Sequence, residues 1–321
     1  MIPLAPEILL VSSRFDYTTD HIVCELERRG ASFLRLNRDE FAEMSLSLTL
    51  APVVLEVVIE GKAYLVTDDT LKGIYFRAPV FLRECTGEPL TADEQLSKQQ
   101  WAAFVRALSV FNKARWINPI GTTFAAEIKP FQLVTASQVG FLIPRTVITN
   151  APSKAILSGS NGTVAVKSLD SAVLNFGNAT EGFVYTSLIS CADLEQSTIA
   201  TSPIIAQQPI VPKLDIRVTV VGQSVFPVAI ADESGEGFTG DWRLEKDQIK
   251  YTKFQLPKEI CQLCTTLVSR LGLTFGGIDL AVSGGDFYFI EVNPTGEWAW
   301  LAALLDLPIA SVICDHLLND V

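Results

Sequence analysis

The chain has 321 residues, of which 48% are hydrophobic and 19% are charged. This length is enough for a large core and, at usual domain sizes, for more than one domain. The formal net charge is −11, from 36 acidic and 25 basic residues, which argues against nucleic acid as a partner because phosphate binding needs a basic surface.

The six cysteines are scattered along the sequence without the spacing of a disulfide scaffold. Cys261 and Cys264 form one close pair, but the chain has only two histidines, so we interpret both cysteines as buried helix residues, not zinc ligands. Residues 1–7 lack the basic start and apolar core of a signal peptide. The longest apolar stretch, 298–318, is interrupted by two aspartates and a proline, so we expect a cytoplasmic protein without a membrane partner.

The first third of the sequence alternates short apolar runs with helical segments, which is typical of a small α/β domain. Gly30 ends the first predicted helix, and Glu60-Gly61 forms the turn of a predicted hairpin. The sequence has no Gly-x-Gly-x-x-Gly fingerprint, so a dinucleotide site is not expected. We place a boundary at Asn118-Pro119. The predicted strands cover 8–12, 33–36, 53–59, 62–66 and 73–76, and the predicted helices cover 18–29 and 93–114.

The second part of the sequence opens with a predicted helix and then becomes rich in strands. Pro130 is expected near the start of that helix, Gly140 at its end, and Lys129 at its N-terminal edge. Residues 232–240 are rich in Gly, Ser and Glu, and we expect a mobile loop there. The predicted strands cover 163–167, 183–189, 203–210, 214–221, 225–231, 248–255, 275–282 and 287–292, with a helix at 258–271.

Three oxygen-bearing side chains converge on the last predicted hairpin. Asp279 lies in its first strand, and Glu291 and Asn293 lie two residues apart in its second strand, so these two face the same side. The turn at 283–286 sets Asp279 roughly opposite them. Both carboxylates lie among apolar residues, where an unpaired charge is costly. Such a set of oxygens suits Mg²⁺, which takes its other ligands from water and phosphates. The sequence therefore predicts a magnesium site. The alternative is a charged hairpin tip without a metal.

The same residues carry a resemblance to the ATP-grasp ligases. Phe275-Gly-Gly-Ile-Asp279 and Ile290-Glu-Val-Asn-Pro-Thr-Gly296 resemble the C-terminal metal motif of that family. Leu214–Gly222, which contains Asp-Ile-Arg, is similar to a strand of the ribosomal-protein-S6 glutamate-ligase branch. Asp241-Trp-Arg243 and Glu297-Trp-Ala-Trp300 resemble the graspetide synthetases, which make microviridin-type lactones and lactams in ribosomal peptides.

This resemblance covers most of the chain and implies an α/β (α+β) ATP-grasp fold in three parts. The N-terminal pre-ATP-grasp α/β domain would span 1–118, the central ATP-grasp subdomain 119–202, and the C-terminal subdomain with the metal site 203–321. ATP and Mg²⁺ are the cofactors that the family uses. The nucleotide-binding residues that the resemblance implies are Lys129, Lys167, Gln207, Gln208, Ile210 and Asp215.

Each of these residues has an implied role in holding ATP. Lys167 would contact the α- and β-phosphates with Lys129 as the second phosphate-side lysine, and the loop 168–177 would cover the phosphates. At the adenine hinge, the Gln208 carbonyl would accept a hydrogen bond and the Ile210 N–H would donate one. Asp215 would hold the ribose hydroxyls or a nearby lysine.

Arg217 and Arg243 are the implied catalytic residues. The family makes an acyl phosphate from a substrate carboxylate and the γ-phosphate of ATP, and an alcohol or amine then attacks it. Preorganised cations stabilise the charge on the transferring phosphoryl group, and a planar guanidinium matches carboxylate or phosphate oxygens. The alternative for Arg217 is a surface ion pair on its strand, and its position two residues from Asp215, on the same face, suits either role.

The leading hypothesis is a ligase that activates Asp or Glu side chains of a precursor peptide with a leader sequence and forms intramolecular ester or amide crosslinks. One alternative is an amino-acid ligase that extends a peptide or small metabolite, as in the S6 branch, and another is a nucleotide sensor without catalysis. The 18 phenylalanines and the mean hydropathy of +0.30 also suggest exposed apolar surface and a homodimer.

Overall fold

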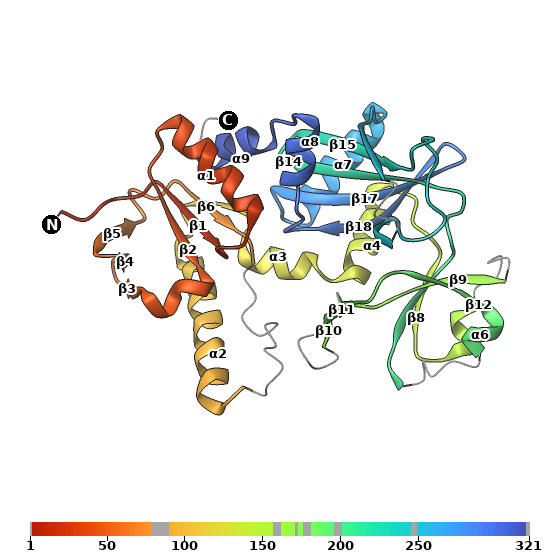
Figure 1. Cartoon of the computed structure of the whole chain (residues 1–321), viewed down its shortest axis with the longest axis horizontal. Coiled ribbons are helices and arrows are strands. Elements are labelled where there is room, and N and C mark those ends of the chain that lie inside the picture. Colours follow the sequence, from red (N-terminus) through yellow and green to blue (C-terminus); the bar gives the residue numbers. More distant parts are fainter. Residues whose placement is uncertain are drawn as a thin grey trace.

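The computed structural model describes residues 2–78, 90–156, 162–170, 173–175, 181–195, 201–244 and 249–318. Figure 1 shows an N-terminal unit on the left and two sheet-containing units on the right, joined by helices α3 and α4. None of the helices in the described part of the chain has both the length and the apolar composition that a bilayer-spanning segment requires.

The N-terminal unit is built on a parallel sheet with strand order β2-β1-β6-β7. The central strand β1 is fully buried, as its unbroken apolar run predicts. Helix α1 begins at the N-cap Asp16 and ends at Gly30, whose φ of +66° is the left-handed conformation that glycine favours. These elements are β1 (Ile8–Ser12), α1 (Tyr17–Arg29), β2 (Phe33–Asn37), β6 (Gly73–Phe76) and β7 (Arg115–Ile117).

An antiparallel meander and a long helix complete this unit. The predicted hairpin is confirmed as β4 and β5, and its turn contains Glu60 and Gly61, both with positive φ. The predicted helix over 93–114 is wrong at its C-terminal end, because α2 stops at Ala107 and a 3-10 turn at Leu108–Val110 follows. The elements are a 3-10 helix (Arg38–Glu43), β3 (Ser45–Leu50), β4 (Val53–Ile59), β5 (Lys62–Thr67) and α2 (Ala92–Ala107).

The central unit follows two helices and contains the antiparallel sheet β12-β9-β13-β8. Helix α4 has Pro130 in its first turn and ends at Gly140, as predicted. Strand β13 is shorter than the predicted 203–210 and stops before Pro209, which has no N–H for a ladder. The elements are α3 (Ile120–Ala126), α4 (Lys129–Val139), β8 (Thr146–Thr149), α5 (Pro152–Ala155), β9 (Thr163–Lys167), β10 (Val173–Asn175), β11 (Glu181–Phe183), β12 (Ser187–Ser190), α6 (Cys191–Glu195) and β13 (Ile204–Gln207).

The C-terminal unit is a five-stranded antiparallel sheet with strand order β16-β15-β14-β17-β18. Helices α4 and α7 bury their apolar sides against it in one core. Cys264 is fully buried and Cys261 half-buried on α7, so the two cysteines are helix residues, as predicted. The elements are β14 (Leu214–Val221), β15 (Ser224–Ala231), a 3-10 turn (Trp242–Leu244), β16 (Lys250–Lys253), α7 (Lys258–Arg270), β17 (Phe275–Ser283) and β18 (Asp286–Asn293).

The last helices, α8 (Ala299–Leu305) and α9 (Ile309–Leu318), carry the chain back to the N-terminal unit (Figure 1). Ile313 and Leu317 of α9 are fully buried in one core with Ile8 of β1. The approach is so close that a Cβ at Gly73 would lie 2.6 Å from the carbonyl oxygen of Leu317. Helix α9 therefore packs on the N-terminal sheet although it follows the C-terminal unit in the sequence. The division of the chain into three parts at residues 118 and 202 stays a prediction.

Candidate functional site

Three neighbouring strands bring charged side chains into one row on the C-terminal sheet. Arg217 of β14 is in register with Asp279 of β17, and Asp279 is in register with Glu291 of β18. Asn293 pairs with Gly277 at the end of the same hairpin, and the register shifts between Asp279 and Leu280. The pairing of β17 with β18 therefore places Asp279 opposite the end of β18 that carries Glu291 and Asn293, as predicted.

Asp279 lies between two arginines. Its Oδ1 is 2.9 Å from Nε of Arg217, and its Oδ2 is 3.2 Å from Nη2 of Arg243. The same Nη2 lies 3.7 Å from Glu291 Oε1. The contact between Arg217 and Asp279 is short enough for an ion pair, but its geometry is not that of a hydrogen bond. The buried Nε–H of Arg217 has no hydrogen-bond partner among the described residues. Asp279 therefore faces one guanidinium with each of its two carboxylate oxygens.

Arg243 is held by the residues around it. Its Nη1 lies 3.2 Å from Oδ1 of Asp241, and its guanidinium stacks 4.8 Å from the ring centre of Trp242. Burial disfavours the cation, but Asp279, Asp241 and Glu291 together outweigh burial and raise the pKa of Arg243. Arg243 is therefore a fixed positive charge at any physiological pH.

The donor set of Asp279, Glu291 and Asn293 fits a magnesium ion. Two carboxylates and one amide oxygen are hard ligands, and they leave coordination positions for phosphates and water. Within the described ranges, no group of three or more His, Cys, Asp or Glu side chains could hold a metal alone.

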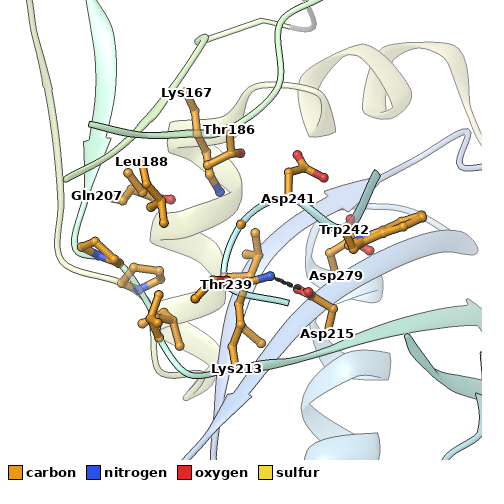
Figure 2. A pocket seen from close by; sticks show the side chains of 18 of the residues that line it. Lys167, Thr186, Leu188, Gln207, Lys213, Asp215, Thr239, Asp241, Trp242 and Asp279 are labelled. Atoms are coloured by element: carbon orange, nitrogen blue, oxygen red, sulfur yellow. Dashed lines mark hydrogen bonds and ion pairs between the residues drawn. The ribbon is translucent and has the colours of Figure 1, made fainter. Parts of the chain in front are cut away.

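A pocket between the central and C-terminal sheets gathers most of the predicted nucleotide residues (Figure 2). Residues 207–211 line the pocket together with Asp279 and Glu291, and Figure 2 shows Gln207 and Asp279 on opposite sides of it. Figure 2 shows Lys167 pointing into this space from above, with the Lys213–Asp215 pair across from it. The predicted residues that line the pocket are Lys167, Gln207, Gln208, Ile210, Asp215, Arg243, Asp279 and Glu291.

The two predicted phosphate-side lysines differ in position. Lys167 ends β9, and burial lowers its pKa although nearby carboxylates, with Glu291 foremost, oppose that shift. Lys129 lies at the start of α4, where its Nζ donates to the carbonyl of Leu169 at 3.5 Å. It lines a second pocket that adjoins the first and shares Lys167, Arg243 and Glu291 with it. Of the predicted phosphate-covering loop 168–177, residues 171–172 and 176–177 lie outside the described residues.

The predicted adenine hinge has free backbone groups. The Gln208 N–H donates to the carbonyl of Arg145 at 2.9 Å, and the Ile210 N–H has no hydrogen-bond partner in the described part of the chain. The side chain of Gln207 is buried, and its Nε2 donates to Thr146 Oγ1 at 2.9 Å. Gln207 thus ties β13 to β8, and the hinge groups open to a ligand are backbone atoms of Gln208 and Ile210.

Lys213 is a site residue that the sequence analysis missed. Its Nζ forms a close ion pair with Asp215 (Figure 2). Burial raises the pKa of Asp215, and Lys213 opposes that rise. Lys213 directly precedes β14 and Asp215 is its second residue, so the two side chains are two positions apart and lie on the same face.

The loop predicted to be mobile is folded into hydrogen-bonded turns over the first pocket. Asp232 N donates to Glu236 O at 2.8 Å, and Glu236 N donates to Asp232 Oδ1 at 2.9 Å. A Cβ at Gly237 would lie 1.6 Å from the carbonyl oxygen of Lys213. Only glycine lets this loop lie so close to the pocket wall.

An aromatic wall lines the second pocket, formed by Trp242, Tyr251 and Trp300. The ring centres of Tyr251 and Trp300 are 4.8 Å apart in an edge-to-face contact, and Trp242 lies 6.5 Å from each. Trp298, by contrast, is fully buried and donates to the Tyr75 hydroxyl at 3.3 Å. The Glu297–Trp300 motif therefore combines one core residue, Trp298, with two residues that line the pocket, Glu297 and Trp300.

Two buried amide side chains, for which no site role was predicted, hold the strands of Asp279 and Glu291 in place. Asn118 receives hydrogen bonds from the Thr274 and Phe275 N–H groups and donates to the carbonyls of Phe275 and Pro294, all at 2.8–2.9 Å. Gln132 makes two hydrogen bonds with the backbone of Val292, at 2.8 and 3.0 Å. Buried polar side chains need such partners, so these amides are fixed. The sequence did not predict these roles, because an asparagine before a proline or a glutamine within a helix is common at positions without any such contact.

The pocket between two antiparallel sheets, with Lys167 on one side and the row of Asp279 and Glu291 on the other, is an arrangement typical of the ATP-grasp fold, and the similarity to solved structures shows that the chain has this fold. It is similar to the macrocyclase MdnC of Microcystis aeruginosa MRC, solved bound with its precursor peptide MdnA, with a TM-score of 0.83 and 24% identity over 98% of this chain and 100% of that one.

Two further solved structures are similar over the whole chain. A RiPP-associated ATP-grasp ligase of Chryseobacterium gregarium, in complex with ADP and a leader and core peptide, gives a TM-score of 0.84 and 24% identity over 98% of this chain and 97% of that one. The ATP-grasp ligase PsnB, complexed with a minimal precursor, Mg and ADP, gives 0.74 and 20% over 99% and 98%. No protein-family model and no curated protein matches the sequence. The predicted α/β ATP-grasp fold, and the resemblance to ATP-grasp ligases of ribosomal peptides at the level of that fold, are confirmed.

Proposed function

We propose that this protein is an ATP- and Mg²⁺-dependent ligase that activates Asp or Glu side chains of a ribosomal precursor peptide and closes intramolecular ester or amide bonds. One observation carries the proposal. The nucleotide pocket and the aromatic-walled pocket meet at Lys167, Arg243 and Glu291. A phosphoryl group held at this junction is within reach of a carboxylate entering from the second pocket.

On the nucleotide side, the backbone of Gln208 and Ile210 would hold the adenine, and Asp215 with Lys213 the ribose. Lys167 and Lys129 would hold the phosphates, and Asp279, Glu291 and Asn293 the magnesium ion, which supplies charge neutralisation at the phosphate oxygens. Because Lys167 is half-buried, its attraction for phosphate is less screened by water than that of a surface lysine.

On the reacting side, Arg217 and Arg243 would orient the substrate carboxylate for attack on the γ-phosphate. The acyl phosphate forms as ADP leaves, and a hydroxyl or amine of the same peptide then displaces phosphate. Both guanidiniums are already held by Asp279, so little reorganisation is needed as charge develops on the phosphoryl oxygens.

The aromatic wall of the second pocket would hold the peptide. Trp242, Tyr251 and Trp300 offer flat, rigid surface at low entropy cost, which suits side chains and backbone of an extended segment. The solved structures with this fold include ones bound with precursor peptides. A precursor peptide with a leader is therefore the partner that we propose.

The test is to incubate the purified protein with ATP, MgCl₂ and a candidate precursor peptide chosen from the short reading frames that flank its gene, and to follow the mass of the peptide and the release of ADP. We expect the loss of one water per crosslink, with one ADP released for each. Mass gain from an added amino acid would instead support the S6-type alternative. ADP release without any change in peptide mass would exclude crosslinking of that peptide.

We further propose a cytoplasmic homodimer. A row of exposed apolar side chains runs along α3 and α4, where Phe124, Ile128, Phe131 and Val134 are 42–55% exposed. Exposed apolar patches of this kind are common at protein interfaces. Light scattering coupled to chromatography would test it, and a monomeric mass at micromolar concentration would contradict it.

A further inference from the structure

A buried ion pair of the N-terminal unit reaches the turn that follows the metal-site strand. Arg77 comes directly after β6, and only 7% of its side chain is exposed. Its Nε donates to Oδ2 of Asp16 at 2.8 Å, and its Nη1 donates to the carbonyl of Thr295 at 2.8 Å. Thr295 is two residues from Asn293, the third proposed metal ligand. At this turn, beside the proposed magnesium site, the Arg77 guanidinium adds a second contact to the hydrogen bond that Asn118 donates to the carbonyl of Pro294.

Asp16 is a fixed anchor for this arginine. It is the N-cap of α1, where its Oδ1 accepts from Thr19 N at 3.2 Å and its Oδ2 accepts from Ser12 Oγ at 3.0 Å. The carboxylate neutralises the buried guanidinium, which would otherwise be costly. Because the guanidinium is planar, fixing its Nε also fixes the direction in which Nη1 points.

The turn itself passes this constraint to Asn293. Oδ1 of Asn293 accepts from Thr295 N at 3.0 Å, and it lies 3.4 Å from Thr295 Oγ1. The peptide carbonyl that Arg77 holds belongs to the same residue whose N–H orients the amide oxygen of Asn293. A shift of Thr295 would therefore move this oxygen relative to Asp279 and Glu291.

The next contact along the chain strengthens the same attachment. The Trp298 Nε1 donates to the Tyr75 hydroxyl at 3.3 Å, and the Arg77 guanidinium lies 5.9 Å from the Tyr75 ring centre. Apolar packing around Trp298 could join the two units without any arginine. Apolar packing has no preferred direction, whereas the hydrogen bond from Arg77 fixes the position of the Thr295 carbonyl.

We infer that Arg77, held by Asp16, is a positioning residue for the magnesium site: it fixes the turn at Asn293–Gly296 so that the Asn293 amide oxygen faces the same space as Asp279 and Glu291. The inference rests on the proposed magnesium site. In this inference, Arg77 and Asp16 of the N-terminal unit contribute to the affinity for Mg²⁺ by positioning a metal ligand of the C-terminal unit.

The test measures ADP binding by calorimetry at increasing MgCl₂ in the full-length protein, for the wild type and for Arg77→Gln and Arg77→Lys. We expect Arg77→Gln to raise the Mg²⁺ concentration at half-effect about tenfold, which corresponds to about 1.4 kcal/mol. ADP affinity in excess EDTA should stay at the wild-type value. Arg77→Lys keeps the charge but reaches only one of the two partners, so it should give a smaller shift.

The matched control is Arg29→Gln. Arg29 also joins the N-terminal unit to the C-terminal part of the chain, through a 2.6 Å ion pair between its Nη1 and Asp315 Oδ1, but on α1 and α9 away from the turn. We expect this variant to lower the unfolding temperature and to leave the Mg²⁺ dependence unchanged. If Arg29→Gln shifts the Mg²⁺ dependence as much as Arg77→Gln does, Arg77 has a general structural role and the inference is wrong.

Other outcomes separate the two proposals. Wild-type protein that binds ADP with no response to Mg²⁺ would refute the proposed magnesium site itself. A wild-type response that both Arg77 variants retain in full would refute the positioning role alone. If Arg77→Gln does not fold, Arg77→Lys and Asp16→Asn give the same comparison.

Discussion

Replacing Asp279 with asparagine removes one charge from the point where two arginines meet and leaves the shape of the side chain almost unchanged. Replacing Glu291 with glutamine makes the same change one strand away. Both residues are proposed metal ligands, so both variants should lose Mg²⁺-dependent ADP binding. They should differ, however, in the stability of the metal-free protein.

The difference follows from burial and distance. The Asp279 side chain is 14% exposed, and its partner Arg217, 2.9 Å away, is 10% exposed. Removing one partner from a buried ion pair costs about 3–5 kcal/mol. Glu291 is 31% exposed and lies 3.7 Å from Arg243, which is 34% exposed. A half-exposed pair of this kind contributes about 0–1 kcal/mol. Asp279→Asn should therefore have a free energy of unfolding lower than that of Glu291→Gln by about 2–5 kcal/mol.

Urea unfolding followed by tryptophan fluorescence in EDTA measures this difference, and calorimetry with ADP and MgCl₂ measures the shared loss of binding. We expect the midpoint for Glu291→Gln to lie near that of the wild type and the midpoint for Asp279→Asn to be clearly lower. Equal midpoints for the two variants would refute the assignment of Asp279 as the main counter-ion of Arg217. Full Mg²⁺ dependence in both would refute the metal site.

Four further predictions follow from the geometry. Lys167→Met should raise the Kd for ADP by about 10- to 100-fold, since hydrogen bonds to charged groups contribute about 1.5–3 kcal/mol, and calorimetry would show an unchanged Kd if this lysine does not touch phosphate. Gly237→Ala should also weaken ADP binding, about tenfold or more, because its Cβ meets the Lys213 carbonyl at 1.6 Å and the loop must move; equal affinity would mean that the loop does not form the pocket wall. Trp300→Ala should slow peptide crosslinking, measured by mass spectrometry, while the affinity for ADP stays constant. A normal crosslinking rate would show that the aromatic wall is not part of the peptide site. Glu25→Gln should be less stable than the wild type near neutral pH, because hydrogen bonds from Arg28 and then Arg29 outweigh burial and lower the pKa of Glu25 to about 2; the difference in unfolding free energy should disappear as the pH falls from about 4.5 through 2, and a difference that persists below pH 2 would contradict this cause.

Local sequence determined the parts of the site that one hairpin contains. The period of a strand sets Glu291 and Asn293 on one face, and the short glycine turn sets Asp279 opposite them. Helix ends were equally local, because Gly30 and Gly140 adopt the positive φ that ends a helix with little strain. These features depend on residues that are close in the chain, so pattern and turn chemistry are enough to predict them.

Long-range pairing decided the rest. Alternation places Arg217 on a face of its strand, but only the antiparallel pairing of β14 with β17 brings it to Asp279. The sequence also treats Trp298 and Trp300 alike, and the fold buries the first against Tyr75 and opens the second to a pocket.

The same reason explains why the contact of Arg77 with Thr295 had no signal in the sequence. The two residues are separated by 218 positions, and their hydrogen bond exists only because the C-terminal helix α9 packs the end of the chain onto the N-terminal sheet. A periodic pattern states which way a side chain faces along its own element. It does not state which distant element lies there, because that depends on how all the apolar faces are buried together.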